Sequence, residues 1–242
     1  MPFLFFMVFV GTSGWNYRDW KGVFYPEDLK KREWFGYYAE RFGTVEVNYT
    51  FYRWPSEEMV DKWHDECPAG FRMTLKAPRM ITHLKKLKEV DGLVRDFYAL
   101  GSRLKGKMGC FLFQLPPNMR FSDNNFAKLE RFVKLLDGRK DNAIEFRDAS
   151  WWRREVFDLL DEHRVGFVTV SGLGLPEDFV ETGGLVYIRF HGDRYGGDYS
   201  RDVLRRYAER LKGSKARKAY VYFNNDKDGF APKNALELKG ML

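Results

Sequence analysis

The sequence predicts an α/β fold, a single (β/α)8 TIM barrel over residues 1–242. Eight short apolar runs, each ending in polar residues, alternate with segments of helical periodicity. Eight strand–helix units in about 250 residues is the usual length of this barrel. An open doubly wound sheet is the alternative, but it normally has fewer strands, and no GxGxxG follows the first run. No Ser/Gly-rich linker divides the chain, so one domain is expected.

The expected strands are rich in β-branched and aromatic residues. They cover residues 6–15, 44–53, 71–78, 109–117, 142–151, 165–172, 185–192 and 218–226. The opening stretch MPFLFFMVFV lacks the basic region and cleavage site of a signal peptide, and it is too short to cross a bilayer. We therefore expect a soluble, cytoplasmic protein without a membrane partner. The two cysteines form no CxxC motif, as is usual for a reduced intracellular protein.

The segments between the strands carry helix signals. Ser56 is a suitable N-cap, followed by two glutamates in the first turn. Apolar residues at 3.6-residue spacing mark the other long segments. The expected helices cover residues 56–67, 90–104, 123–138, 152–165 and 200–213, with a small closing helix in APKNALELKGML.

The strand ends carry polar residues in one alternation phase. The second strand alternates Val-Glu-Val-Asn, the fifth Ile-Glu-Phe-Arg and the seventh Ile-Arg-Phe-His. In a TIM barrel alternate side chains point inward, and the C-terminal mouth carries the chemistry. We therefore expect these polar side chains to meet at one mouth. The set is Glu46, Asn48, Thr74, Lys76, Gln114, Glu145, Arg147, Asp148, Arg189, His191, Asn224 and Asn225.

These charges could simply pair with one another inside the barrel. Burying so many of them costs more than an apolar plug of similar volume, so a functional pocket explains the set better. The net charge of +7 permits a nucleic-acid partner without requiring one. Aromatic residues beyond the first two strands, Tyr52 among them, could stack on a sugar or base or could form loop core. Abundant Lys, Arg and Glu with a single glutamine suggest a thermophilic source.

Seven ordered motifs resemble the YecE-like family, domain of unknown function 72. They are GTSGWNYRDWKGVFYP, TVEVNYTFYRWP, FRMTLKAPRMITH, FLFQLPP, IEFRDASWW, YIRFHG and YVYFNNDKDGFAPKNAL. The resemblance covers about residues 11–240 and implies a TIM barrel. It implies that Glu46, Asn48, Glu145, Arg147, His191, Asn224 and Asn225 match motif positions. This sequence has Asp148 where the family commonly has His, and Ser171-Gly172 where many members carry an Asp.

The resemblance leaves the cofactor open. The family barrel is similar in architecture to xylose-isomerase-like barrels, which usually hold divalent metals with His, Asp and Glu. Possible ligands of a divalent metal here are Glu46, Glu145, Asp148 and His191. Three nearby cations, Lys76, Arg147 and Arg189, would repel a metal cluster, so a three-histidine zinc site is not expected.

The first functional hypothesis is a nuclease, a phosphodiester hydrolase acting on DNA or RNA. Glu46 or Glu145, with His191, would supply the general base and acid, while Lys76 and Arg189 would hold the phosphate. The substrate-binding set is Asn48, Tyr52, Gln114, Arg147, Asp148, Asn224 and Asn225. The alternatives are a sugar or sugar-phosphate isomerase or hydrolase, and a non-catalytic nucleic-acid-binding barrel. The expected partner is thus nucleic acid or a small phosphorylated substrate. The sequence does not indicate the oligomeric state.

Overall fold

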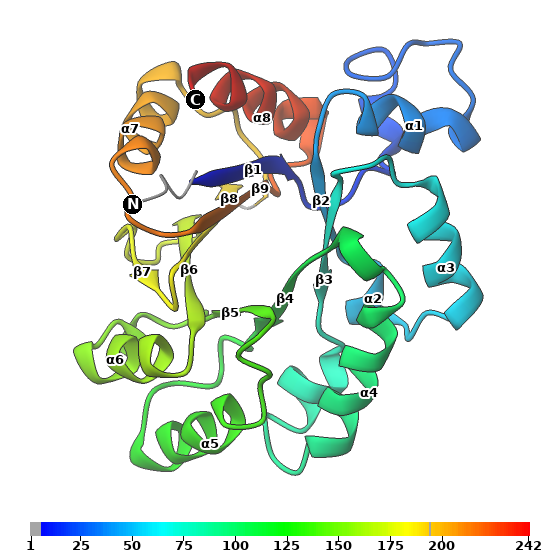
Figure 1. Ribbon diagram of the computed structural model, residues 1–242. Helices are drawn as coiled ribbons and strands as arrows, with labels where there is room; N and C mark the ends of the chain where they lie inside the picture. Colours follow the sequence, from blue (N-terminus) through cyan, green and yellow to red (C-terminus); the bar gives the residue numbers. More distant parts are fainter. Residues whose placement is uncertain (1–5, 194) are drawn as a thin grey trace, which may run out of the picture.

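Eight parallel strands form a nearly closed barrel with helices around it (Figure 1). The computed structural model describes residues 6–193 and 195–242. Hydrogen-bonded neighbours follow the order β1-β9-β8-β6-β5-β4-β3-β2, so the first and last strands of this path are consecutive in the chain. The predicted (β/α)8 TIM-barrel fold is confirmed, and the open sheet is excluded.

Each of the eight predicted strands is present; β6 and β8 have the predicted bounds, and the other six are shorter. They are β1 (Met7–Thr12), β2 (Thr44–Val47), β3 (Arg72–Lys76), β4 (Met108–Gln114), β5 (Asp141–Glu145), β6 (Val165–Gly172), β8 (Leu185–Gly192) and β9 (Lys218–Phe223). An additional strand, β7 (Glu181–Thr182), pairs antiparallel with β8. Two residues are too few to give a periodic signal, so the sequence did not predict this strand.

The long helices lie where the sequence placed them. They are α3 (Glu57–Glu66), α4 (Asp91–Ser102), α5 (Asp123–Val133), α6 (Arg154–Glu162), α7 (Arg201–Lys212) and α8 (Phe230–Met241). The Ser56 hydroxyl accepts a hydrogen bond from the Met59 N–H and caps α3 as predicted. The sequence did not predict the shorter elements. They are the helices α1 (Trp34–Ala39) and α2 (Tyr49–Tyr52), the 3-10 turns η1 (Arg18–Trp20), η2 (Lys31–Glu33), η4 (Lys105–Lys107), η5 (Ala149–Trp151) and η6 (Lys227–Gly229), and the π turn η3 (Met80–Leu84). Among the residues described, no helix is long and apolar enough to cross a membrane.

A side chain closes the barrel between β1 and β2. The Tyr38 hydroxyl accepts a hydrogen bond from the Thr12 N–H at 3.0 Å and donates one to the Thr44 carbonyl at 2.9 Å. It thus takes the place of a direct backbone bond between the two strands. A Cβ atom on Gly11 would lie 2.3 Å from the Thr44 carbonyl oxygen, so this approach requires glycine. Further along, Ser13 and Glu46 form a parallel bridge between the two strands.

The barrel interior is partly polar. Tyr222 on β9 shares hydrogen bonds of 2.7 Å with the hydroxyls of Thr44 and Thr74, on β2 and β3. Tyr187 on β8 donates to Glu46 on β2 at 2.6 Å. These bonds cross the barrel and fix its opposite walls to each other. The polar residues at the strand ends share this inward phase, because successive side chains of a strand point to opposite faces.

The predicted strand over residues 44–53 is wrong beyond Val47. Asn48 adopts a helical conformation (φ −85°, ψ −14°), and α2 follows it. The Thr50 hydroxyl donates to the Lys76 carbonyl at 2.5 Å and fixes this short helix to the end of β3. As a result, Phe51 and Tyr52 lie over the mouth of the barrel.

Candidate functional site: a polar cavity at the barrel mouth

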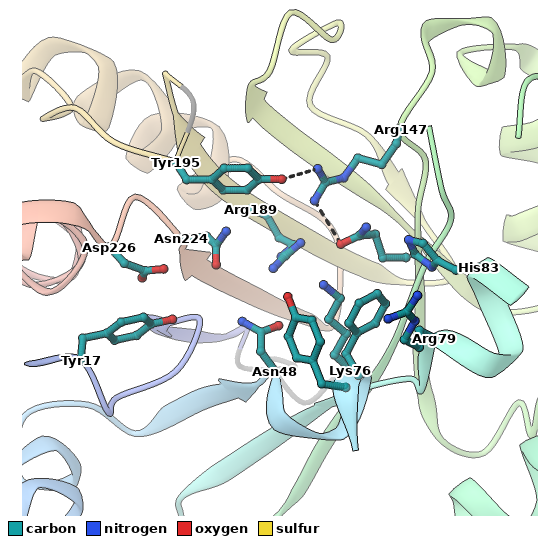
Figure 2. A pocket seen from close by; sticks show the side chains of 13 residues that line it. Tyr17, Asn48, Lys76, Arg79, His83, Arg147, Arg189, Tyr195, Asn224 and Asp226 are labelled. Carbon is teal, nitrogen blue, oxygen red and sulfur yellow. Dashed lines mark hydrogen bonds between the residues drawn. The ribbon is translucent and has the colours of Figure 1, made fainter. Parts of the chain in front are cut away.

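A cavity of about 610 Å³ opens at the C-terminal ends of the strands (Figure 2). The ends of β3, β4 and β8 contribute to it, together with residues just beyond β2, β5 and β9, the loops after β1 and β8, α2 and η3. We call this space the cationic cavity. Its lining consists of Tyr17, Asn48, Phe51, Tyr52, Lys76, Arg79, His83, Gln114, Arg147, Arg189, Tyr195, Asn224 and Asp226. The volume lies in the range of small-molecule sites.

A fully buried ion-pair network lies at the base of this cavity. Arg189 donates from Nη2 to Glu46 Oε1 at 2.6 Å and from Nη1 to Glu145 Oε2 at 2.5 Å. Glu46 also accepts hydrogen bonds from the hydroxyls of Ser13 at 2.5 Å and Tyr187 at 2.6 Å. Both carboxylates are completely buried. We call Glu46, Glu145, Arg189 and His191 the floor.

The charges around Glu145 hold its carboxylate in the ionised form. Burial alone would raise the pKa of Glu145, but the charges of Arg147 and Arg189 hold that pKa well below its usual range. Arg147 Nε donates to the Oε1 atom of Glu145, so both of its oxygens are engaged. Neither Glu46 nor Glu145 lines the cavity. Their role in this geometry is to hold Arg189 in place.

His191 is a buried, neutral member of the floor. Burial and the charge of Arg189 lower the pKa of His191 to about 4. Its Nδ1 lies 3.1 Å from the amide nitrogen of Asn224, and its Nε2 lies 3.6 Å from Glu145 Oε1. The imidazole therefore connects the floor to Asn224 on the cavity wall. At pH 7 it carries no charge, so it does not add to the positive field.

Lys76 is a buried cation that faces the cavity. It is 8% exposed, and its Nζ lies 4.2 Å from the centroid of the Phe51 ring. Within the described part of the chain, the ammonium group has no salt bridge or hydrogen bond to protein. Burial, followed by the charge of Arg189, lowers the pKa of Lys76 to about 7. This amine can therefore gain and lose a proton near neutral pH.

Asp226 is the corresponding acidic group. Burial raises the pKa of Asp226 to about 7. Its Oδ1 atom is buried and finds no hydrogen-bond partner among the described residues. Figure 2 places Asp226 and Lys76 on different sides of the cavity, after β9 and at the end of β3. The Oδ1 atom of Asn48 on the cavity wall is likewise buried and, within the same described ranges, without a partner.

Arg147 spans one side of the cavity. Its guanidinium donates to the Tyr195 hydroxyl at 2.9 Å and to Gln114 Oε1 at 3.1 Å, and both bonds are drawn in Figure 2. His83 and Arg79 enter from the π turn η3 and the residue before it. Burial and the charge of Lys76 lower the pKa of His83 to about 4, so this ring is neutral. The basic side chains of the cavity thus outnumber its ionised acidic ones.

The family model described as "Protein of unknown function DUF72" matches residues 9–242. The chain belongs to the DUF72 family. The solved structure of a DUF72 family protein from Thermotoga maritima is 33% identical, covers 97% of this chain and 98% of that one, and superposes with a TM-score of 0.89. A DUF72 family protein from Enterococcus faecalis, at 21% identity and a TM-score of 0.82, shares the fold over 98% of this chain and 95% of that one.

Two curated relatives carry family names without an activity. The UPF0759 protein YunF of Bacillus subtilis is 24% identical over 98% of this chain and 95% of its own length. The UPF0759 protein YecE of Escherichia coli is 28% identical over 61% of this chain, and the match spans only about half of that protein, 51%. The resemblance to the YecE-like family seen in the sequence is thus confirmed.

In this DUF72 protein the predicted site residues separate into three groups. Asn48, Tyr52, Lys76, Gln114, Arg147, Arg189 and Asn224 line the cavity. Glu46, Glu145 and His191 lie in the floor beneath it, with Arg189 belonging to both layers. Asp148 and Asn225 lie outside. Asp148 accepts hydrogen bonds from Ser150 and Arg120 and caps η5, and Asn225 donates to the Gly197 carbonyl and to Asn234.

Several cavity residues escaped the sequence analysis. Tyr17, Arg79, His83, Tyr195 and Asp226 come from loops or short turns, where no strand alternation applies. Asp226 had a detectable signal, because it is the last residue of the predicted strand over 218–226 and follows directly on Asn224 and Asn225.

The donor set does not fit the divalent metal suggested by fold analogy. Within residues 6–193 and 195–242, no group of three or more His, Cys, Asp and Glu side chains could hold a metal ion. Glu46 and Glu145 are already paired with Arg189, and Asp148 lies away from the cavity. We therefore derive no chemical step through a metal.

Proposed function

We propose that this protein is a phosphoester hydrolase whose cationic cavity holds the phosphate of a nucleic acid or nucleotide. One observation carries the proposal: the ammonium of Lys76, a side chain buried to 8% exposure, faces the cavity without a hydrogen-bond or ion-pair partner in the described protein. A buried charge is costly unless an opposite charge or hydrogen-bond partners compensate it. Since the described protein supplies no such partner, an anionic ligand is the natural counter-charge. A phosphate oxygen suits this environment because Arg147 and Asn48 also face the cavity.

The two groups with near-neutral pKa provide a proton path. A water molecule attacks phosphorus, and the Asp226 carboxylate takes its proton. The bond from phosphorus to the leaving oxygen breaks, and the Lys76 ammonium donates a proton to that oxygen. Arg147 and Arg189 stabilise the charge that develops on the other phosphate oxygens. This assignment replaces the predicted base and acid, Glu46 or Glu145 with His191, because those side chains lie in the paired floor.

The rim of the cavity favours a nucleic acid or nucleotide over other phosphates. Tyr52 and Tyr195 are 69% and 44% exposed there, Arg147 donates to the Tyr195 hydroxyl, and Arg79 belongs to the same lining. Exposed aromatic rings next to basic side chains are what single-stranded nucleic acid binds, through stacking and phosphate contacts. The net charge of +7 acts in the same direction.

The test is hydrolysis of labelled single-stranded DNA, duplex DNA, RNA and bis(p-nitrophenyl) phosphate, each with and without chelator. We expect cleavage that falls by about 10²–10⁴-fold in Lys76→Met, because one proton-transfer group is lost. Lys85→Met, an exposed position after η3, is the matched control and should retain full activity. Binding should weaken steeply with salt. Binding without cleavage would instead indicate a non-catalytic barrel, and neither binding nor cleavage would refute the proposal.

A sugar-phosphate isomerase is the second candidate, favoured by the enclosed size of the cavity, about 610 Å³. Asp226 and Lys76 could then move a proton between adjacent carbons of the substrate. Deuterium uptake from D₂O into pentose and hexose phosphates measures this reaction directly. Deuterium uptake by the wild type without any phosphate release would indicate an isomerase, provided that Asp226→Asn abolishes the uptake.

A further inference from the structure

A second cavity, of about 370 Å³, lies next to the cationic one. We call it the aromatic cavity. Its lining consists of Gly14, Trp15, Asn16, Tyr17, Val47, Asn48, Tyr49, Met59 and Trp63. Among these described lining residues none is charged, and four are aromatic. It therefore offers a ligand flat apolar surfaces rather than ionic contacts.

The two cavities share a wall. Tyr17 and Asn48 line both of them, so the two spaces are adjacent and differ in character on the two sides of these side chains. The Tyr17 hydroxyl donates to the Ser13 carbonyl at 2.5 Å, which fixes the ring between the cavities. Gly14 permits this position, because its φ is +95° and a Cβ atom there would lie only 3.0 Å from that hydroxyl.

Local structure arranges the rings of the aromatic cavity. Tyr49 is the first residue of α2, so it lies in the cavity only because β2 ends at Val47. The rings of Tyr49 and Trp63 meet edge to face, with centroids 6.2 Å apart, and Tyr49 remains 39% exposed. Trp15 packs on Phe35, with centroids 5.1 Å apart. The surfaces available to a ligand are therefore held by neighbouring side chains before it binds.

We propose that the aromatic cavity is a nucleobase subsite, so that the ligand is a nucleotide unit whose base lies there and whose phosphate lies in the cationic cavity. This inference rests on the proposed function, because it assumes that the cationic cavity holds phosphate. Bases stack favourably on aromatic side chains, and a nucleotide joins a flat ring to a phosphate through one sugar. The buried Oδ1 of Asn48, which lacks a partner among the described residues, lies on the shared wall and can accept a hydrogen bond from the sugar or base.

Equilibrium binding of three probes separates the contributions of the two cavities. The probes are adenosine 5′-monophosphate, ribose 5-phosphate and adenosine, measured by calorimetry and by tryptophan fluorescence. We expect the nucleotide to bind about 10- to 100-fold more tightly than ribose 5-phosphate, the usual contribution of one stacked base. Only the two probes that carry a base should quench the fluorescence of Trp15 and Trp63, because only they reach the aromatic cavity.

Tyr49→Ala is the diagnostic variant, since the exposed ring can be removed with little effect on folding. It should lower nucleotide affinity about 10-fold and leave ribose 5-phosphate affinity unchanged. Trp54→Ala, an aromatic residue 44% exposed and absent from both linings, is the control and should change neither. Equal affinities for nucleotide and ribose 5-phosphate would overturn the subsite while leaving the phosphate proposal intact. Failure of both phosphorylated probes to bind would refute the proposed function as well.

Discussion

The floor and the cavity wall above it, which carries Lys76 and Asp226, both hold ionisable side chains at the barrel mouth. They differ in how many hydrogen-bond and ion-pair partners those side chains have. In the floor, Arg189 contacts two carboxylates, and each carboxylate has further hydrogen-bond donors. On the wall, Lys76 is buried and Asp226 is half-buried, and among the described residues the Lys76 ammonium and the buried Asp226 Oδ1 atom have no hydrogen-bond or ion-pair partner. Burial alone therefore does not identify a functional charge in this barrel. The unpaired groups are the ones whose pKa values approach 7.

The same difference sets opposite signs for mutational effects on stability. Removing one member of a buried pair leaves an uncompensated charge, which is strongly destabilising. Removing a buried charge that has no partner relieves a desolvation penalty instead. Floor substitutions should therefore destabilise the protein, whereas substitutions of Lys76 or Asp226 should stabilise it while lowering activity. Proteins commonly retain destabilising groups at functional sites.

Glu145→Gln should have the largest effect. It leaves Arg189 and Arg147 short of a counter-charge, and breaking a buried pair costs about 3–5 kcal/mol. Urea denaturation should show this loss in the free energy of unfolding. Glu162→Gln, at an exposed position on α6, is the control and should change stability by less than about 0.5 kcal/mol. A loss below about 1 kcal/mol at Glu145 would mean that the floor is not a structural network.

Lys76→Met should instead increase the free energy of unfolding. The folded protein holds the pKa of Lys76 at about 7, below its ordinary value of 10.5, so the folded state binds fewer protons than the unfolded state between these values. The penalty is complete below pH 7 and disappears as pH rises toward 10.5. We expect the variant to be more stable by about 2–4 kcal/mol at pH 6, with a smaller gain at pH 9.5. A variant that is less stable at pH 6 would show that Lys76 has a structural partner.

Strand periodicity explains which parts of the site the sequence could predict. The alternation in β2 and β8 placed Glu46, Arg189 and His191 inside the barrel correctly, because the side-chain period of a strand is fixed at two. The same reasoning could not tell floor from wall. That distinction depends on hydrogen-bond partners from other strands, such as Tyr187 for Glu46. The periodicity of a single strand does not predict which strands will lie opposite it in the barrel.

The prediction was unreliable once the chain left the strands. Asp148 and Asn225 lie two or three residues beyond β5 and β9, next in sequence to the cavity residues Arg147 and Asn224, yet each turns away to hold a neighbouring loop. Conversely, Tyr17 and Tyr195 reach the cavity from loops whose course no periodicity describes. The strand over 44–53 was extended too far because the aromatic residues of α2 have high strand propensity, whereas the hydrogen bond from Thr50 to the Lys76 carbonyl favours the helical turn.

Asp226→Asn should give the smallest change in stability, and its pH dependence has a definite sign. Burial raises the folded-state pKa of Asp226 to about 7 from its ordinary value of 3.8, so the folded state binds more protons than the unfolded state between these two values. The stability that this group contributes is present below pH 3.8 and is lost as pH rises through 7. Asparagine keeps the shape and carries no charge. The variant should therefore match the wild type near pH 4 and exceed it by about 1–2 kcal/mol at pH 8.

Thermal unfolding at pH 4, 6 and 8 measures this trend, with Asp96→Asn at an exposed position of α4 as the control. The same variant should lose the acid limb of any pH–rate profile, because that limb reports deprotonation of the base. A stability difference that does not vary between pH 4 and 8 would mean that Asp226 titrates normally. Lys76 would then be the one wall residue with a pKa shifted to near 7, and the proton acceptor would have to be another residue of the cavity.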